Sequence, residues 1–215
     1  MLKSDVIEKI LKEKIIVIVR GVGKNNILPF AKAVYEGGVR AIELTYDASN
    51  PEKDQENAEN IKMLVDYFGD KMLIGAGTVI RENQVELTKK AGGSFIISPD
   101  TNENIIKKTC ELNMVSIPGA LTPTEIQTAH LAGADFVKLF PVSTFGAQYV
   151  KDVKVPLSHI RILAVGGINE KNISDYLAAG ADGFGIGSNI VNKKLIETED
   201  FNGITELTKK FLKAL

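Results

Sequence analysis

DFVKLF, residues 135–140, predicts a strand that is buried on both faces, as in parallel sheets. Its one discordant residue is Lys138, which stands between Val137 and Leu139. A buried ammonium without a partner is costly, so a lysine in such a strand usually loses its charge or meets an anion. Lys138 is therefore a candidate functional residue.

The strand predicted at 135–140 is one of a regular series. Seven other runs are rich in β-branched or small apolar residues: IIVIVR (15–20), VRAIELT (39–45), KMLIGAG (71–77), SFIIS (94–98), MVSIPGA (114–120), IRILAV (160–165) and DGFGIG (182–187). Helical patterns with apolar residues three or four apart follow the strands, and another helix is predicted at about 3–13. Eight such units in one chain predict a (β/α)₈ TIM barrel with an N-terminal helix, forming a single domain over 1–215. The alternative is an open doubly wound sheet, which usually has fewer strands.

The amino-acid composition argues against nucleic acid and membranes as binding partners. The 215 residues are 44% hydrophobic and 25% charged, and the formal net charge is −1. This balance provides no basic field for nucleic acid or for an anionic membrane, and no apolar run reaches the roughly 18 residues of a membrane span. The first residues are charged and helical, unlike a signal peptide, so we expect a cytoplasmic protein. Cys110 is the single cysteine, which excludes an internal disulfide.

The C-terminal ends of the strands build the active site in barrels of this kind. The two most informative segments are VGGIN (165–169) and GIGSN (185–189), at the C-terminal ends of the last two predicted strands. Barrels often bind a phosphate group between the loops that follow these two strands. Glycine lets the backbone approach an oxyanion closely, which makes Gly166, Gly167, Gly187 and Ser188 candidate phosphate ligands. The competing interpretation is that these glycines only turn tight corners.

Glu43 and Lys138 each interrupt an apolar strand near its C-terminal end. They could form a buried structural ion pair, which would add little net stability. Alternatively, the two residues could be catalytic. A desolvated lysine is easier to deprotonate, and only the neutral amine attacks a carbonyl to form a Schiff base. A nearby carboxylate could carry protons to and from the substrate.

His130 and His159 are predicted to lie away from the strand ends. Because no His, Asp and Glu cluster has metal-ligand spacing, we expect neither a metal nor a cofactor.

Several of these segments together resemble the 2-keto-3-deoxy-6-phosphogluconate (KDPG) and 4-hydroxy-2-oxoglutarate (KHG) aldolase family. The resemblance covers essentially the whole chain and is carried by VIVRG (17–21), GGVRAIELT (37–45), IGAGTV (74–79), FIISP (95–99), SIPGALTPTEI (116–126), FVKLFP (136–141), GGIN (166–169) and GIGS (185–188). It implies a metal-free class I aldolase on a (β/α)₈ barrel, typically a homotrimer.

The resemblance also implies roles for individual residues. Lys138 matches the Schiff-base lysine and Glu43 the general acid and base, while Thr78 matches the threonine that helps hold the pyruvate carboxylate. The remaining matches are to substrate-binding positions: Arg20 at the end of the first strand, Pro99, Pro118 and Phe140 in the pocket lining, and Gly166, Gly167 and Ser188 at the phosphate.

Two positions depart from the family pattern. The family commonly has arginine four residues after the catalytic glutamate, where this chain has Asp47, and Pro-Thr before the glycine pair, where it has Ala164 and Val165. The first change removes a cation near the substrate, and the second removes a hydroxyl beside the phosphate site. Neither changes the lysine or the glutamate, so the reaction class is better supported than the substrate.

The expected reaction is cleavage of KDPG to pyruvate and glyceraldehyde 3-phosphate, with cleavage of 4-hydroxy-2-oxoglutarate to pyruvate and glyoxylate as a further activity. The C4 stereochemistry stays open, so 2-keto-3-deoxy-6-phosphogalactonate (KDPGal) is an alternative substrate. Two other classes compete: a phosphosugar isomerase or synthase on the same barrel, and a phosphometabolite-binding module with a structural ion pair. Neither of those requires a buried amine.

Overall fold

A computed structural model describes residues 1–215 and contains one sheet of nine parallel strands. The strands are β1 (Ile15–Val19), β2 (Ala41–Thr45), β3 (Leu73–Gly77), β4 (Phe95–Ile97), β5 (Val115–Ile117), β6 (Gly119–Ala120), β7 (Val137–Leu139), β8 (Ile162–Val165) and β9 (Gly183–Ile186). Their order is β5-β4-β3-β2-β1-β9-β8-β7-β6. The two outermost strands follow each other directly in the chain, so the sheet closes on itself. The predicted barrel is confirmed, and the open-sheet alternative is wrong.

The closure corrects one predicted element. The single strand expected over 114–120 is divided into β5 and β6 at Pro118, which has no N–H to donate to a ladder. β5 pairs with β4 on one side, whereas β6 pairs with β7 through the register of Gly119 with Lys138. The carbonyl of Pro118 accepts a hydrogen bond of 2.8 Å from the backbone N–H of Lys138. The two short strands together therefore occupy the fifth barrel position and carry the seam beside Lys138.

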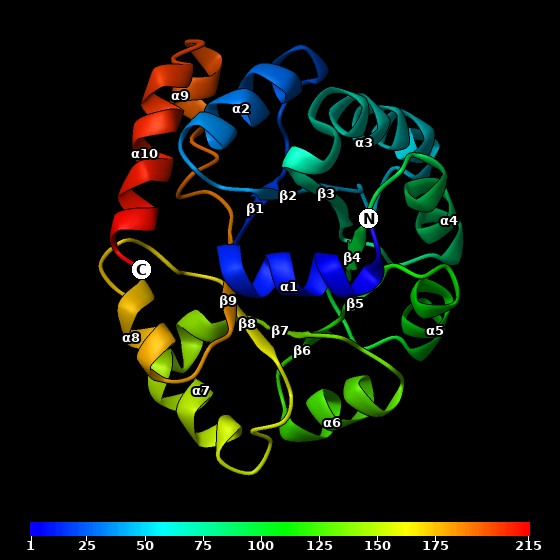
Figure 1. Ribbon diagram of the computed structural model, residues 1–215, viewed down its shortest axis with the longest axis vertical. Coiled ribbons are helices and arrows are strands. Elements are labelled where there is room, and N and C mark those ends of the chain that lie inside the picture. Colours follow the sequence, from blue (N-terminus) through cyan, green and yellow to red (C-terminus); the bar gives the residue numbers. More distant parts are fainter.

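Helices surround the strands (Figure 1). They are α1 (Lys3–Glu13), α2 (Lys24–Glu36), α3 (Asp54–Phe68), α4 (Glu82–Lys90), α5 (Glu103–Glu111), α6 (Pro123–Leu131), α7 (Gly146–Lys154), α8 (Ile173–Ala178), α9 (Lys193–Glu197) and α10 (Phe201–Lys213), with short 3₁₀ turns at Pro51–Lys53, Gly69–Lys71 and Val142–Thr144. The last helix completes the ring by packing on α2, where the Thr205 hydroxyl donates to the Ala33 carbonyl at 3.0 Å. None of the helices combines the length and apolar character that crossing a membrane requires.

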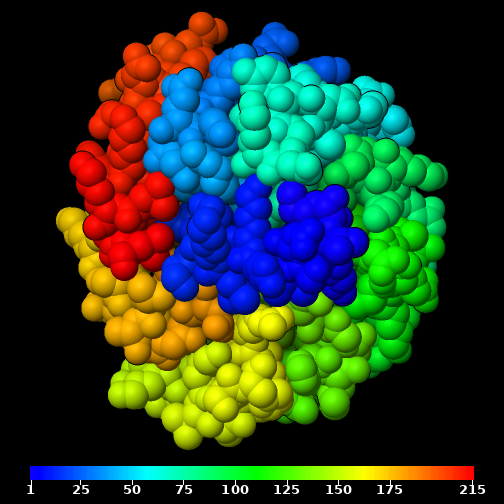
Figure 2. All heavy atoms as spheres, viewed as in Figure 1, coloured from blue at the N-terminus to red at the C-terminus, as the bar shows by residue number.

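One end of the barrel is covered by α1, as expected for the predicted N-terminal helix. Figures 1 and 2 show this helix, in dark blue, lying across the middle of the face in view. Its Val6 and Ile10 join an apolar cluster with strand residues that fill the barrel interior, among them Ala41 and Phe136. This packing seals the end at which the strands begin, so the open mouth lies at their C-terminal ends.

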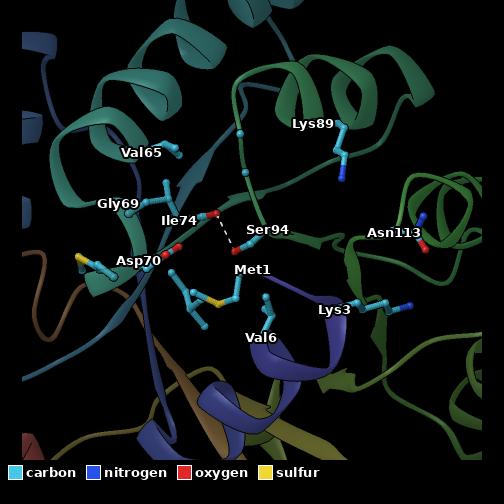
Figure 3. Close-up of a pocket in the computed structure, with 14 residues that line it drawn as sticks. Met1, Lys3, Val6, Val65, Gly69, Asp70, Ile74, Lys89, Ser94 and Asn113 are labelled. Carbon is cyan, nitrogen blue, oxygen red and sulfur yellow. Dashed lines mark hydrogen bonds between the residues drawn. The ribbon is translucent and has the colours of Figure 1, made fainter.

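A cavity of about 310 Å³ lies between α1 and the adjoining strand ends. Figure 3 shows Met1, Lys3 and Val6 on one side of it, opposite Ile74 and Ser94, whose hydroxyl donates to the Ile74 carbonyl at 3.1 Å. No predicted site residue lines this cavity. It is a gap beneath the N-terminal helix, at the opposite end from the candidate active site.

Candidate active site

Glu43 lies in the middle of β2 and points into the barrel. Successive side chains on a strand alternate between faces, and Ala41, two residues earlier, belongs to the interior cluster. Glu43 is 1% exposed, and its Oε2 has no hydrogen-bond partner. Burial raises the pKa of this carboxyl to about 7, although the positive charges of Lys138 and Arg20 oppose the increase. A carboxyl with such a pKa can both accept and return a proton near neutral pH.

Lys138 occupies the corresponding interior position of β7, two residues after the buried Phe136. Burial lowers the pKa of its ammonium; Glu43 raises it, and Arg20 lowers it further. The ammonium Nζ lies 5.0 Å from the centre of the Phe140 ring. A half-buried amine with a lowered pKa is easier to deprotonate, which is the state needed for attack on a carbonyl.

Glu43 and Lys138 share the barrel interior without forming an ion pair. Their charged groups are not within the 4.0 Å of a salt bridge, and neither oxygen of Glu43 accepts a hydrogen bond from Lys138. This geometry argues against the structural ion pair considered from the sequence. Both charged groups are therefore left without an ion-pair partner inside the barrel.

The arginine and the threonine predicted at the site meet directly. Arg20 follows β1 and Thr78 follows β3, and the guanidinium Nη2 donates to the threonine Oγ1 at 2.6 Å. Thr78 has a φ of 55°, in the left-handed region that a β-branched residue rarely adopts. This unusual backbone turns the chain sharply at the end of β3 and brings the hydroxyl to the cation.

The predicted lining residues lie on neighbouring strand ends. Pro99 is exposed after β4, Pro118 is buried between β5 and β6, and Phe140 is 42% exposed after β7. A Cβ on Gly119 would clash with the carbonyl of Pro99, so the loop after β4 closely approaches β6. These residues flank Lys138 on the side where the barrel closes.

The two glycine loops also lie at the mouth. Gly166 and Gly167 follow β8 with φ values of 101° and 74°, while Gly187 and Ser188 follow β9. The Asn189 side chain ties the two loops by donating to the Ile168 carbonyl at 2.6 Å. The loops are therefore held side by side, the arrangement needed for binding a shared anion.

Two residues in this region were not predicted. A cavity of about 500 Å³ is lined by Gly187 and Ser188 together with Arg20, Lys193 and Lys194. The two lysines begin α9, only a few residues after the glycine loop, and that proximity in the chain is the signal that could have indicated them. They increase the positive charge around the predicted phosphate site.

Asp47, which replaces the arginine common in the family, forms hydrogen bonds with residues of its own loop. Its carboxylate accepts from the Asn50 side chain at 2.6 Å and from the Ser49 backbone N–H at 2.9 Å. These hydrogen bonds lower its pKa. Asp47 shares a cavity of about 490 Å³ with Arg20 and Lys53, so cations still line this part of the rim.

The second departure lies inside the barrel mouth. Val165 is 6% exposed, and a Cβ added to Gly185 would lie 2.8 Å from its Cγ2. Ala164, on the opposite face of β8, is fully buried in the outer core between strands and helices. Val165 is therefore the departure that changes the lining of the mouth from polar to apolar.

Comparisons with known proteins show which family the chain resembles. The family described as KDPG and KHG aldolase matches residues 6–207. The 2-dehydro-3-deoxy-6-phosphogalactonate aldolase of Escherichia coli (strain K12) is 37% identical over 180 residues, covering 83% of this chain and 85% of the relative. The 2-dehydro-3-deoxy-phosphogluconate aldolase of Haemophilus influenzae (strain ATCC 51907 / DSM 11121 / KW20 / Rd) is 32% identical, covering 97% of this chain and 96% of the relative.

Solved aldolase structures superpose on this chain over most of its length. A native KDPGal structure superposes with a TM-score of 0.83 at 34% identity, covering 93% of both chains. A KDPG aldolase from Legionella pneumophila, with pyruvate captured as a covalent carbinolamine, superposes with a TM-score of 0.84 at 27% identity, covering 94% of this chain and 96% of that one. The barrel and these similarities define a class I aldolase, a lyase of sugar acid metabolism. The chain belongs to the KDPG and KHG aldolase family.

Proposed function

We propose that this protein cleaves a phosphorylated 2-keto-3-deoxy sugar acid reversibly into pyruvate and glyceraldehyde 3-phosphate. The observation that carries the proposal is the relation of Glu43 to Lys138. The two groups enter one barrel interior without pairing, and burial shifts the pKa of each toward its neutral form. This combination suits a reaction that needs a neutral amine and a proton carrier together.

Lys138 is the nucleophile in this proposal. Its neutral amine adds to the C2 carbonyl, and loss of water gives a protonated imine that can accept an electron pair. The addition product that precedes loss of water is a carbinolamine, and the Legionella pneumophila KDPG aldolase has been captured with pyruvate in that form.

Glu43 moves the protons. Its carboxylate takes the proton of the C4 hydroxyl as the C3–C4 bond breaks, and the bonding electrons pass into the imine to form an enamine while the aldehyde departs. Glu43 then returns the proton to C3. Water hydrolyses the resulting pyruvyl imine, which releases pyruvate and regenerates the free amine of Lys138. The unpartnered Oε2 supports this role, because no protein group competes for it.

The other strand-end residues hold the substrate. Thr78 and Arg20, which are hydrogen-bonded to each other, would bind the carboxylate next to the reacting ketone. Pro99, Pro118 and Phe140 would line the pocket around that end of the substrate.

The phosphate would lie between the two glycine loops. Gly166 and Gly167 can offer backbone N–H groups without a Cβ in the way, and Gly187 and Ser188 face the cavity that Lys193 and Lys194 also line. An anion there would be met by backbone donors, a hydroxyl and two cations.

For the substrate series, we propose the galactonate compound, KDPGal. Its support is the higher identity to the galactonate aldolase from E. coli, 37% against 32% for the gluconate aldolase from H. influenzae. KDPG is the second candidate, supported by that relative's similarity over nearly the whole chain. Cleavage of 4-hydroxy-2-oxoglutarate would be a side activity, because this compound has no phosphate to use the glycine loops.

The test combines trapping with substrate comparison. Borohydride reduction in the presence of pyruvate should attach one pyruvate-derived group to wild-type protein and none to Lys138→Met. Lys154→Met is the matched control, because Lys154 is also partly buried but lies in an ion pair with Asp182. Rates of cleavage of KDPGal, KDPG and 4-hydroxy-2-oxoglutarate then rank the substrates. No adduct on the wild-type protein would overturn the Schiff-base proposal, and faster cleavage of KDPG would overturn the galactonate assignment.

A further inference from the structure

A second layer of residues holds the backbone conformation of Thr78. A β-branched residue with a φ of 55° persists only where the surrounding structure favours that conformation. The conformation matters because it brings the Thr78 hydroxyl to Arg20. Whatever fixes residues 78–81 therefore also fixes this contact.

Gln84 is the first of these residues. It lies in the first turn of α4 and is completely buried. Its side-chain Oε1 accepts from the backbone N–H of Ile80 at 2.9 Å and of Arg81 at 3.2 Å. One buried amide thus anchors the loop that runs from Thr78 into α4.

Asp54 in turn anchors Gln84 and Arg81. It begins α3, is 4% exposed, and accepts from the Gln84 Nε2 at 3.0 Å. The Arg81 Nη2 donates to both carboxylate oxygens, at 3.0 and 3.2 Å. Asp54 belongs to the segment after β2, so this ion pair connects the loop after β2 to the loop after β3.

The strand that carries Glu43 is tied to the same cluster. Tyr46, which directly follows β2, is 1% exposed and places its hydroxyl 3.1 Å from the Thr88 hydroxyl and 3.3 Å from the Gln84 carbonyl. The ends of β2 and β3 therefore share one buried polar network on α4. Apart from the Arg81 Nε, which has no hydrogen-bond partner, the buried side-chain groups of this network are satisfied. A polar network of this kind specifies one arrangement, while its buried ion pair adds little net stability.

We propose that Asp54 is a positioning residue for substrate binding: through Gln84 and Arg81 it holds Thr78 in the conformation that meets Arg20. This inference rests on the proposed role of Thr78 at the pyruvate carboxylate. Asp54 itself is buried and lines neither of the two cavities at the mouth.

The test compares Asp54→Asn with Asp182→Asn. Asp182 is a suitable control because its carboxylate, like that of Asp54, accepts from one cation, here Lys154 at 3.0 Å. Its second donor is the backbone N–H of Ile162 at 2.7 Å instead of a side-chain amide, and it lies at the opposite end of the barrel. In borohydride trapping, Asp54→Asn should raise the half-saturating pyruvate concentration roughly tenfold, within the losses that misplacement of a binding group causes. The amount trapped at saturation should be unchanged. Asp182→Asn should leave both values at the wild-type level.

A second readout does not depend on activity. Amide hydrogen exchange of Ile80 and Arg81 should become faster in Asp54→Asn and stay slow in Asp182→Asn. If Asp54→Asn fails to fold, Arg81→Met replaces it, because the Arg81 side chain is 30% exposed and tolerates substitution more readily.

The outcomes separate the two proposals. If wild-type protein traps no pyruvate, the proposed function is refuted. Amide hydrogen exchange of Ile80 and Arg81 would still report whether Asp54 holds the loop between Thr78 and α4. Unchanged exchange in Asp54→Asn, or an equal rise in half-saturation in both aspartate variants, would overturn the positioning role.

Discussion

Gly77 lies directly against the carboxylate of Glu43, and a Cβ on Gly77 would overlap the Oε1 oxygen. β2 and β3 are neighbours, with Glu43 opposite Gly75 and Thr45 opposite Gly77. The missing side chain of Gly77 therefore creates the space that the buried acid occupies, whereas the missing side chain of Gly75 makes room for the Phe95 ring. The family motif GAGT thus has a steric function at its second glycine, immediately before Thr78.

Gly77→Ala should displace the Glu43 carboxylate and reduce cleavage by about 10²-fold or more, the contribution of a positioned proton carrier. The protein should still trap pyruvate, because the alanine methyl contacts Glu43 and not Lys138. Gly23→Ala is the comparison, since a Cβ there has no neighbour within 4 Å and its φ of −61° suits alanine. Trapping and cleavage assays on both variants check this prediction, which equal activity of Gly77→Ala and wild type would contradict.

Lys138→Met should abolish both pyruvate trapping and cleavage. Methionine fills similar space and removes a half-buried ammonium, so we expect the free energy of unfolding not to fall. Urea denaturation and turnover measured on one preparation check both statements. Turnover near that of wild type in Lys138→Met would exclude Lys138 as the nucleophile.

Glu43→Gln should separate imine formation from proton transfer. Glutamine keeps the length of the side chain but cannot accept a proton, so cleavage and exchange of the pyruvate methyl protons should both fall by ~10²–10⁴-fold. Trapping of pyruvate should persist at a reduced rate. NMR measures the exchange of the pyruvate methyl protons with solvent. Undiminished exchange in Glu43→Gln would rule out Glu43 as the base.

The raised pKa of Glu43 also predicts a pH dependence of stability. Its carboxyl has a pKa of about 7 in the folded protein and 4.5 as the reference value, so between these values the folded state binds more protons than the unfolded state. The stabilisation is complete below pH 4.5 and is lost as the pH rises through about 7, an effect of about 3 kcal/mol. The difference in unfolding free energy between wild type and Glu43→Gln should follow this course. A difference that stays constant with pH would contradict the assigned pKa.

Ser188→Asp tests the phosphate site. A carboxylate facing the phosphate should raise the KM for a phosphorylated substrate much more than the KM for 4-hydroxy-2-oxoglutarate, which has no phosphate. Steady-state kinetics on both compounds measure this difference. An equal increase for both would indicate that Ser188 lies outside the phosphate site or that the variant is misfolded.

Much of the fold follows from local patterns in the sequence. Apolar runs of strand length alternate with helical periodicity, and this alternation is sufficient to predict the barrel and the helix at 3–13 that covers one end. The same patterns reveal Glu43 and Lys138, because a charged residue inside an apolar strand is conspicuous and costly. Parallel strands then bring their C-terminal ends to one mouth, so the site residues could be grouped before their contacts were known.

Only the tertiary structure decided how these residues relate to one another. Local periodicity does not reveal that β5 and β6 divide at Pro118 to close the barrel, because that depends on which strands become neighbours. It also leaves open whether Glu43 and Lys138 pair, since a difference of a few ångströms separates an ion pair from two free groups. The bonds from Asp54 to Gln84 and Arg81 span about 30 residues of sequence and exist only because α3 packs beside α4. Sequence determines which groups are placed at the mouth, whereas long-range packing determines the distances and burial on which their chemistry depends.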